Sequence, residues 1–551
     1  MSVNKLACLP QYEGIELPGR QDPKPFDLLL YGLTLLTMFS LFTPHVQALS
    51  TQEVPSPRLH LGDLTVIGEQ LTTPKVQVFR GVPFAEAPTG DNRWRAPKPY
   101  LPSKSPQMAL EFAPACYQGP HIIDWYQGVI EDFGGDPTSI SAPMVSEDCL
   151  YLNIWRPNTN ETKLPIVVFI HGGSNRGGFS YEPNYLGHNL ADTGLIVITI
   201  AYRLGVFGFF AHPELSETNF GLLDQIAALT FIRTHAEAIG GDPNRITVMG
   251  ESSGANSIGW LITSPLAEGL FQRAIHQSGG SAFTRSTYWR EAADLGATLT
   301  ATLSRNASIA DSISAARQLT PAVVLKTANL VYQDVYFDPV IDGKSLPDAP
   351  RTRLKSGNIQ SVDLLIGSNR DERRMYLDPS ETLSNWLDQN VSAEARMALQ
   401  PRLNTYESEA RALDVISTAK QYVCPSLALA KAINDLNNNS YVYEFDRVRP
   451  GKMAASMGAY HGAELPYIFN THDTWLPTDA IDVALTGQIQ AYWRSFIETG
   501  NPNSGLVTKD ANTLPFWPNY GDEVRLALVL DDTISTRTHS STDICNLFAK
   551  D

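Results

Sequence analysis

The chain has 551 residues, a length that suggests a few domains although large α/β enzymes routinely form a single one, and its 43% of hydrophobic residues are enough for a sizeable core. Its 42 basic and 58 acidic side chains give a net charge of −16, which argues against nucleic-acid or anionic-membrane partners because both need basic patches. No Cys-x-x-Cys pair occurs and no Cys/His cluster has zinc spacing, so we expect neither a metal nor a cofactor.

The N-terminal segment has the features of a secretory signal. Residues 28–42 are uncharged and apolar, and Val46-Gln47-Ala48 provides the small residues that a signal peptidase reads. We expect residues 1–48 to be removed by cleavage after Ala48, leaving residues 49–551 as one exported domain, secreted or periplasmic. Because residues 1–27 are not basic, two alternatives stay open: translation starts later than Met1, or the segment is an uncleaved N-terminal anchor. No other stretch is apolar for long enough to span a bilayer.

The rest of the chain alternates predicted strands and helices without repeats. An entering hairpin is expected from Leu61–Ile67 and Val76–Phe79. Strands are then expected at 166–170 and 195–201, a helix at Asp224–Ile239 that is ended by Gly240-Gly241, and further strands at 245–249, 364–367 and 440–445. This order predicts right-handed crossovers in a mostly parallel sheet, with functional groups at the carboxyl ends of its strands.

A serine lies at the apex of a sharp turn between the strand at 245–249 and the small residues that follow it. The turn reads Gly250-Glu251-Ser252-Ser253-Gly254. A serine hydroxyl becomes a useful nucleophile only when it is held exposed beside a base and amide donors. Taken alone, the pentapeptide could equally be a glycine-rich surface turn.

Partners for Ser252 follow neighbouring strands. The turn His171-Gly172-Gly173-Ser174 offers backbone N–H groups to an oxyanion, while Asp371 and Glu372 are nearly equal candidates for the acid. Three histidines follow the acid. We favour His461 as the base because glycines flank its turn, and we interpret His472 and His539 as surface residues. The expected order along the chain is serine, acid, histidine, so His276 comes too early and is expected to be packed.

Four further segments carry a family resemblance, and they read FRGVPFAEAP (79–88), SEDCLYLNI (146–154), NFGLLDQ (219–225) and GGDP (240–243). Together with the serine turn they resemble the type-B carboxylesterase/cholinesterase family over roughly residues 57–550. The resemblance implies an α/β-hydrolase fold with a large, mostly parallel central sheet and helices on both faces.

The resemblance also assigns roles. It implies that Ser252 is the nucleophile, Glu372 the acid and His461 the base. The N–H groups of Gly173, Ser174 and Ser253 would form the oxyanion hole, with Ser174 standing where many members have glycine. It further implies the disulfides Cys116–Cys149 and Cys424–Cys545, which leave only Cys8 unpaired.

The resemblance implies a small-molecule carboxylic ester as substrate. Choline esters are not expected, since the family's choline-binding tryptophan would fall near Ser139 and no Trp lies between Gln127 and Cys149. We interpret Arg373-Arg374 as structural in preference to lining the site for acidic substrates. An adhesion domain without activity, a lipase and an amidase are alternatives. The filled triad positions favour an enzyme over the first, and the lack of a long amphipathic lid favours an esterase over the others.

Overall fold

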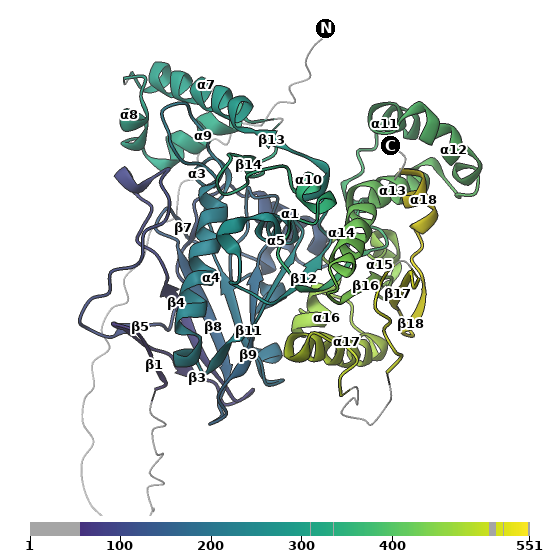
Figure 1. Cartoon of the computed structure of the whole chain (residues 1–551), viewed down its shortest axis with the longest axis horizontal. Coiled ribbons are helices and arrows are strands. Elements are labelled where there is room, and N and C mark those ends of the chain that lie inside the picture. Colours follow the sequence, from purple (N-terminus) through teal and green to yellow (C-terminus); the bar gives the residue numbers. More distant parts are fainter. Residues whose placement is uncertain (1–55, 309, 334, 506–513, 522, 549–551) are drawn as a thin grey trace, which may run out of the picture. The chain divides into compact units, whose positions relative to one another are not determined.

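The computed structural model describes residues 56–548 except 309, 334, 506–513 and 522 (Figure 1). These residues belong to one compact unit, Val54–Asp551. The predicted signal segment, its cleavage site and Cys8 lie outside the described residues.

The core of the fold is an 11-stranded sheet in the order β18-β17-β16-β15-β12-β11-β9-β10-β8-β4-β3. The seven consecutive strands from β17 to β10 are parallel: β10 (Ile196–Ile200), β9 (Leu164–Ile170), β11 (Gly241–Glu251), β12 (Arg273–Gln277), β15 (Asp363–Asn369), β16 (Ser440–Phe445) and β17 (Leu526–Leu530). Antiparallel strands complete both edges: β18 (Ser535–Thr538) on one, and β8 (Tyr151–Pro157), β4 (Val76–Pro83) and β3 (Glu69–Gln70) on the other. The predicted mostly parallel sheet is confirmed.

Helices cover both faces of this sheet, as expected. All of β9 is buried, and its alternate side chains enter two different cores. Ile166, Val168 and Ile170 pack in a core shared with α4 (Phe220–Ile239) and α5 (Ser253–Thr263). Val167 and Phe169 pack on the opposite face with α16 (Leu465–Phe469) and α17 (Ala480–Thr499).

The remaining helices form the surroundings of this sheet. Figure 1 shows α7, α8 and α9 gathered in one group and α11, α12, α13 and α18 in another, at the opposite side of the view. Their bounds are α1 (His121–Asp132), α2 (His188–Ala191), α3 (Gly205–Gly208), α6 (Ser281–Thr284), α7 (Trp289–Ala307), α8 (Ile313–Arg317), α9 (Pro321–Val331), α10 (Pro350–Lys355), α11 (Leu383–Asn390), α12 (Ala393–Leu403), α13 (Glu409–Thr418), α14 (Cys424–Asp435), α15 (Lys452–Met457) and α18 (Thr542–Phe548). Short strand pairs stand apart from the sheet: β6 (Ala115–Cys116) with β7 (Val145–Ser146), and β13 (Thr287–Tyr288) with β14 (Val340–Ile341).

The predicted entering hairpin is wrong in its pairing. Gly62, at φ +64°, begins a turn inside the run that we expected to be one strand. That turn divides the run into β1 (Arg58–Leu61) and β2 (Leu64–Ile67), which pair with each other, and β2 also pairs with β5 (Gln107–Met108). The second expected strand became β4, which joins β8 in the central sheet. Helix α4 begins earlier than expected, at Phe220.

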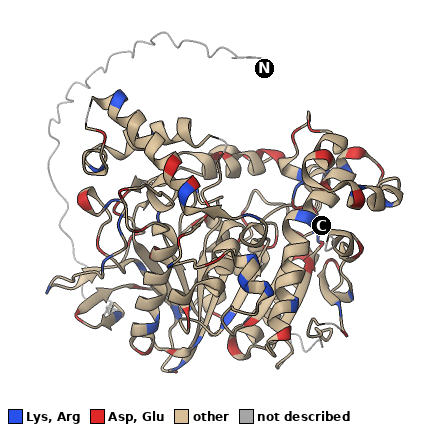
Figure 2. Ribbon diagram, turned by 45° about the horizontal axis from the view of Figure 1, so that its top comes forward, with Lys and Arg blue, Asp and Glu red and all other residues tan. Residues whose placement is uncertain are grey.

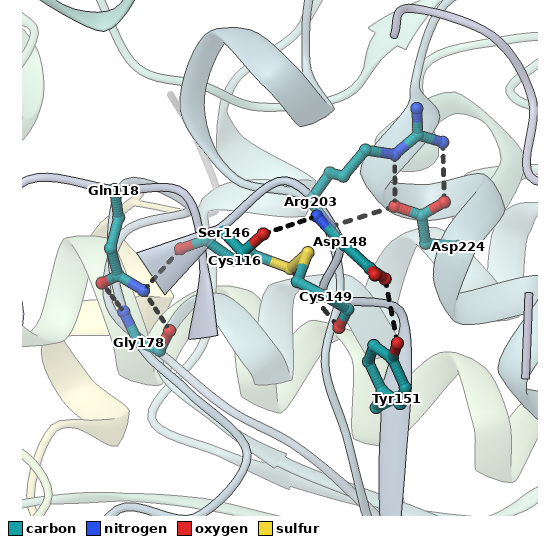
Figure 3. Close-up of a disulfide and its surroundings, with 9 residues drawn as sticks. All are labelled: Cys116, Gln118, Ser146, Asp148, Cys149, Tyr151, Gly178, Arg203 and Asp224. Carbon is teal, nitrogen blue, oxygen red and sulfur yellow. Dashed lines mark hydrogen bonds and ion pairs between the residues drawn. A yellow bond between two sulfur atoms is a disulfide. The ribbon is translucent and has the colours of Figure 1, made fainter. Parts of the chain in front are cut away.

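Both predicted disulfides are present, with S–S distances of 2.03 Å for Cys116–Cys149 and 2.02 Å for Cys424–Cys545. Figure 3 shows Cys116–Cys149 with the Gln118 amide beside it. That amide donates to the Gly178 carbonyl at 2.7 Å and accepts from the Gly178 N–H at 2.8 Å. The first disulfide therefore anchors a side chain that holds the segment following the glycine turn at 171–174.

None of the helices in the described part of the chain is both long and apolar enough to cross a bilayer.

Candidate active site

The serine turn connects β11 directly to α5, and Ser252 has a positive φ of +56° with ψ −122°, a backbone conformation that residues other than glycine rarely adopt. Its N–H donates to the Gln277 carbonyl of the neighbouring strand β12 at 2.9 Å. The flanking glycines are required sterically. A β-carbon at Gly250 would lie 2.6 Å from the Gly254 backbone, and one at Gly254 would lie 2.0 Å from the Ile170 carbonyl oxygen. The expected strand–turn–helix is confirmed.

The glycine turn after β9 lies against the serine turn. A β-carbon at Gly172 would stand 3.0 Å from the Ser252 β-carbon. Gly173 and Ser174 both have positive φ, +101° and +58°. Within the described residues, the N–H groups of Gly173, Ser174 and Ser253 have no hydrogen-bond acceptor. Ser174 thus adopts the left-handed backbone despite its β-carbon, at a cost of about 1 kcal/mol.

The acid and base candidates come together behind the cavity. Glu372 is fully buried just after β15, and its Oε1 accepts the Asn369 N–H at 2.7 Å. Its Oε2 lies 2.5 Å from Nδ1 of His461.

Asp371, the other acid candidate, faces away from the imidazole. Its carboxylate pairs with Arg370 at 2.8 Å and with Arg411, and it accepts the Ala459 N–H at 2.8 Å. Asp371 therefore fastens the segment that carries His461, while Glu372 contacts the ring itself.

A second carboxylate lies on the other side of the ring. Nε2 of His461 is 3.2 Å from Oε1 of Glu251, the residue before Ser252. No hydrogen bond joins Ser252 Oγ to His461 within the described residues. Burial raises the pKa of Glu251 well above its usual range. Burial alone would lower the pKa of His461, but the negative charges of Glu251 and Glu372 outweigh it and raise that pKa well above its ordinary value.

The other histidines lie elsewhere. His276 is fully buried, as expected. His472 is half-buried, and its Nε2 is 2.8 Å from Thr486 Oγ1. The prediction that His539 lies on the surface is wrong, since only 4% of it is exposed. It follows the edge strand β18 and accepts the Ser541 N–H at 3.2 Å.

Ser252 and His461 line a cavity of about 1340 Å³, together with Gly173, Ser174 and Ser253. Aromatic side chains form much of its wall, among them Trp125, Tyr336, Tyr376 and Tyr422. The Trp125 indole donates to the Tyr376 hydroxyl at 3.0 Å. Counting back from Cys149 did not predict this tryptophan, because the length of the loop between Cys116 and Cys149 is not fixed by the motif.

Three buried carboxyl groups at the site were missed from the sequence. Glu251 was visible inside the serine pentapeptide, but nothing marked it as a neighbour of the base. Glu464 shares Asn369 with the acid candidate Glu372, because it accepts from Asn369 Nδ2 at 2.7 Å; it also accepts from Gln277 Nε2 at 3.1 Å. Glu182 lines the cavity and accepts the Phe179 N–H at 2.9 Å; burial raises its pKa to about 7. No group of three or more metal-binding side chains is assembled among the described residues.

Known proteins align with this chain over most of its length. Residues 56–548 match the sequence profile of the carboxylesterase family. The chain is 33% identical to para-nitrobenzyl esterase of Bacillus subtilis over 483 residues, 84% of this chain and 92% of that enzyme. It is 32% identical to acetylcholinesterase of Bungarus fasciatus, over 81% of this chain and 77% of that protein.

A solved structure gives the same result. The carboxylesterase of Geobacillus stearothermophilus superposes with a TM-score of 0.75 at 28% identity, covering 89% of this chain and 99% of that one. The α/β-hydrolase fold is thereby confirmed. This chain belongs to the carboxylesterase family and is a carboxylic ester hydrolase.

Proposed function

We propose that the chain hydrolyses carboxylic esters through an acyl-enzyme formed on Ser252, with His461 as general base and Glu372 as its orienting acid. The contact between Glu372 Oε2 and His461 Nδ1, behind the cavity that Ser252 enters, is the observation that carries the proposal. Neutral His461 takes the Ser252 proton at Nε2, and the alkoxide adds to the ester carbonyl. The imidazolium, stabilised by Glu372, protonates the departing alcohol, and water then repeats the sequence on the acyl-enzyme.

Before that proton transfer, the ring must exchange its contact with Glu251 for one with Ser252. Glu251 and Ser252 are adjacent in the chain, so a small movement of Nε2 is enough. When the ring is neutral its Nε2 is an acceptor, so a protonated Glu251 carboxyl, favoured by its raised pKa, would donate to it. This neutral hydrogen bond is weaker than the ion pair between a carboxylate and an imidazolium.

The tetrahedral oxyanion is proposed to lie among the N–H groups of Gly173, Ser174 and Ser253. Their lack of acceptors within the described residues supports this role, and each donor is worth about 3–4 kcal/mol in the barrier. Ser174 contributes only its backbone, so a glycine is not needed at that position once the left-handed conformation is formed.

A fluorophosphonate probe tests the nucleophile. We expect the native protein to take up one label, Ser252→Ala to take up none, and the activity of this variant on nitrophenyl esters to fall at least about ten-thousand-fold. Ser281→Ala is the matched control, because Ser281 lines the same cavity on α6. Equal labelling of the native protein and Ser252→Ala would refute the proposal.

We further propose that choline esters are not the natural substrates. The support is the charge of the cavity wall, where basic side chains outnumber carboxylates, since this opposes a quaternary ammonium group. Trp125 supplies an indole, so the aromatic surface alone does not decide. We expect acetylthiocholine to be cleaved with no higher kcat/KM than its neutral isostere, 3,3-dimethylbutyl thioacetate. A tenfold preference for the cation would contradict this.

Export completes the proposal, with residues 1–48 as a signal peptide. Two disulfides in the described chain support it, because disulfides persist mainly in oxidising compartments outside the cytosol.

A further inference from the structure

We propose that the cavity accepts esters that also carry a free carboxylate, and that the guanidinium of Arg373 receives this carboxylate. The inference rests on the proposed function, because it concerns the substrate of the same site. Arg373 directly follows Glu372 and lines the cavity that contains Ser252 and His461.

Arg373 lacks the partners that a structural arginine has. Its Nε is screened from solvent and has no hydrogen-bond acceptor, and its side chain forms no ion pair within the described residues. By contrast, Arg370, three residues earlier, pairs with both Asp371 and Asp446. Arg176, in the segment that follows the glycine turn, donates to the carbonyls of Tyr332 and Val335 at 2.9 and 2.6 Å. Because no acceptor or ion-pair partner of this guanidinium of Arg373 lies among the described residues, its terminal nitrogens are left for an acceptor that a ligand would supply.

The guanidinium lies close enough to the reaction centre for one substrate to reach both. Its central carbon is 5.8 Å from the centre of the Tyr376 ring, which in turn is 5.7 Å from the centre of the His461 ring. Tyr422 packs on His461 at 5.5 Å and lines the same wall. A short acyl or alkyl chain extending from the ester carbonyl along these rings would end at Arg373.

The charges of the cavity also favour an anion. Seven Lys and Arg side chains line it against four carboxyl groups, the reverse of the chain as a whole with its 42 basic and 58 acidic side chains. Asp338 is paired with Arg285 at 3.0 Å, and Asp435 with Lys431 at 2.8 Å. Burial raises the pKa of Glu182 to about 7 and that of Glu251 to about 8, so neither of these deep carboxyl groups is fully ionised at neutral pH.

Basic and acidic residues are otherwise scattered over the whole fold, as Figure 2 shows. The local excess at the cavity is therefore not part of a general basic surface. A planar guanidinium binds a carboxylate through two parallel hydrogen bonds, a geometry that a lysine cannot offer. Arg374 differs from its neighbour, because it is exposed and does not line the cavity.

The test compares matched esters in the native protein, Arg373→Gln, Arg373→Lys and Arg374→Gln. The first pair is mono-4-nitrophenyl adipate and its methyl ester, with the charge on the acyl side. The second is 4-carboxyphenyl butyrate and its methyl ester, with the charge on the alcohol side. The readout is the ratio of kcat/KM for the acid over the neutral ester, at low and high ionic strength.

We expect this ratio to exceed one in the native protein for at least one pair. Arg373→Gln should reduce it about tenfold or more, Arg373→Lys should reduce it less, and Arg374→Gln should leave it unchanged. Added salt should lower the native ratio, because it screens the attraction.

An unchanged ratio in Arg373→Gln, or an equal change in Arg374→Gln, would overturn the inference. Thermal unfolding of each variant checks that it is folded, and the ratio cancels any general loss of activity. Failure of the proposed function is separate, because it would appear as neutral-ester hydrolysis that survives Ser252→Ala.

Discussion

At the scale of single residues, the imidazole of His461 stands between two carboxyl groups, one at each ring nitrogen. Glu372 is 2.5 Å from Nδ1 and Glu251 is 3.2 Å from Nε2. Both carboxyl groups raise the pKa of the ring. Glu372 contacts Nδ1 and leaves Nε2 available to the serine, whereas Glu251 contacts Nε2 itself. As a carboxylate, Glu251 therefore stabilises the imidazolium at the expense of the neutral form of the proposed base, and we expect this balance to set the pH below which activity is lost.

Glu251→Gln tests this balance. A neutral amide cannot become the carboxylate that stabilises the imidazolium, so the pKa of His461 should fall. Because activity needs the neutral ring, the acidic limb of the kcat/KM–pH profile should move to lower pH by about one unit. Glu182→Gln is the control, since Glu182 lies in the same cavity but does not contact His461. Reduced activity with an unmoved midpoint would show that Glu251 does not tune the base.

Some of these residue-level contacts could not be predicted from the sequence. Asp371 and Glu372 both follow β15, and spacing does not say which side chain turns toward the ring. The answer depends on the Ala459 N–H and on Arg411, which come from distant segments and hold Asp371. Trp125 was missed for a similar reason, because only folding of the loop between two cysteines brings it to the cavity.

At the scale of elements, the Cys424–Cys545 disulfide ties the C-terminal helix α18 to the wall of the cavity. Both cysteines line the cavity, and Cys424 begins α14 directly after the π-helical turn Ala419–Val423, which carries Tyr422. π-Helical turns occur often at functional sites, where they alter the direction of side chains.

Removal of each disulfide should destabilise the protein to a different extent. The two cysteines are 121 residues apart in the sequence for Cys424–Cys545 and 33 residues apart for Cys116–Cys149. By the chain-entropy argument, Cys424→Ser with Cys545→Ser should lower the free energy of unfolding about 1 kcal/mol more than the other double variant. Denaturant unfolding measures both. The opposite order would mean that local contacts, such as Gln118 on Gly178, outweigh loop closure.

The strands and helices were largely predictable where the apolar residues of a segment recurred with one clear spacing. Five buried strands of the sheet were expected within a few residues, because apolar β-branched runs between turn residues leave few alternatives. The entering hairpin failed because Gly62 allowed a turn inside an alternating run, a change of direction that periodicity does not record. The first turn of α4, which begins at Phe220, was missed because the helical spacing of apolar residues was followed only from Asp224 onward.

At the scale of the whole molecule, the fold could be predicted because several motifs occur in the order of a known family, each with its own structural reason. The identity of the substrate could not, because it depends on the wall of a cavity that segments from most of the chain assemble.

At this scale we predict that the N-terminal segment is cleaved during export. Expression of the full chain in a host with a general secretory pathway should give an exported protein whose first residue is Leu49, as determined by mass spectrometry. Ala48→Arg should block cleavage, because the peptidase requires a small residue there. Active enzyme held in the membrane with residues 1–48 intact would support the anchor instead.

The close approach of Gly254 to the end of β9 has a consequence for recombination. A β-carbon at Gly254 would collide with the Ile170 carbonyl, and the glycine turn begins at the residue after Ile170. The serine turn and the glycine turn therefore fit each other closely and form one block. A chimera with a related esterase would have to take residues 170–174 and 250–254 from the same parent. Crossovers between the two segments would separate surfaces that have been shaped together, whereas the cavity wall around Arg373 can be exchanged without touching that block.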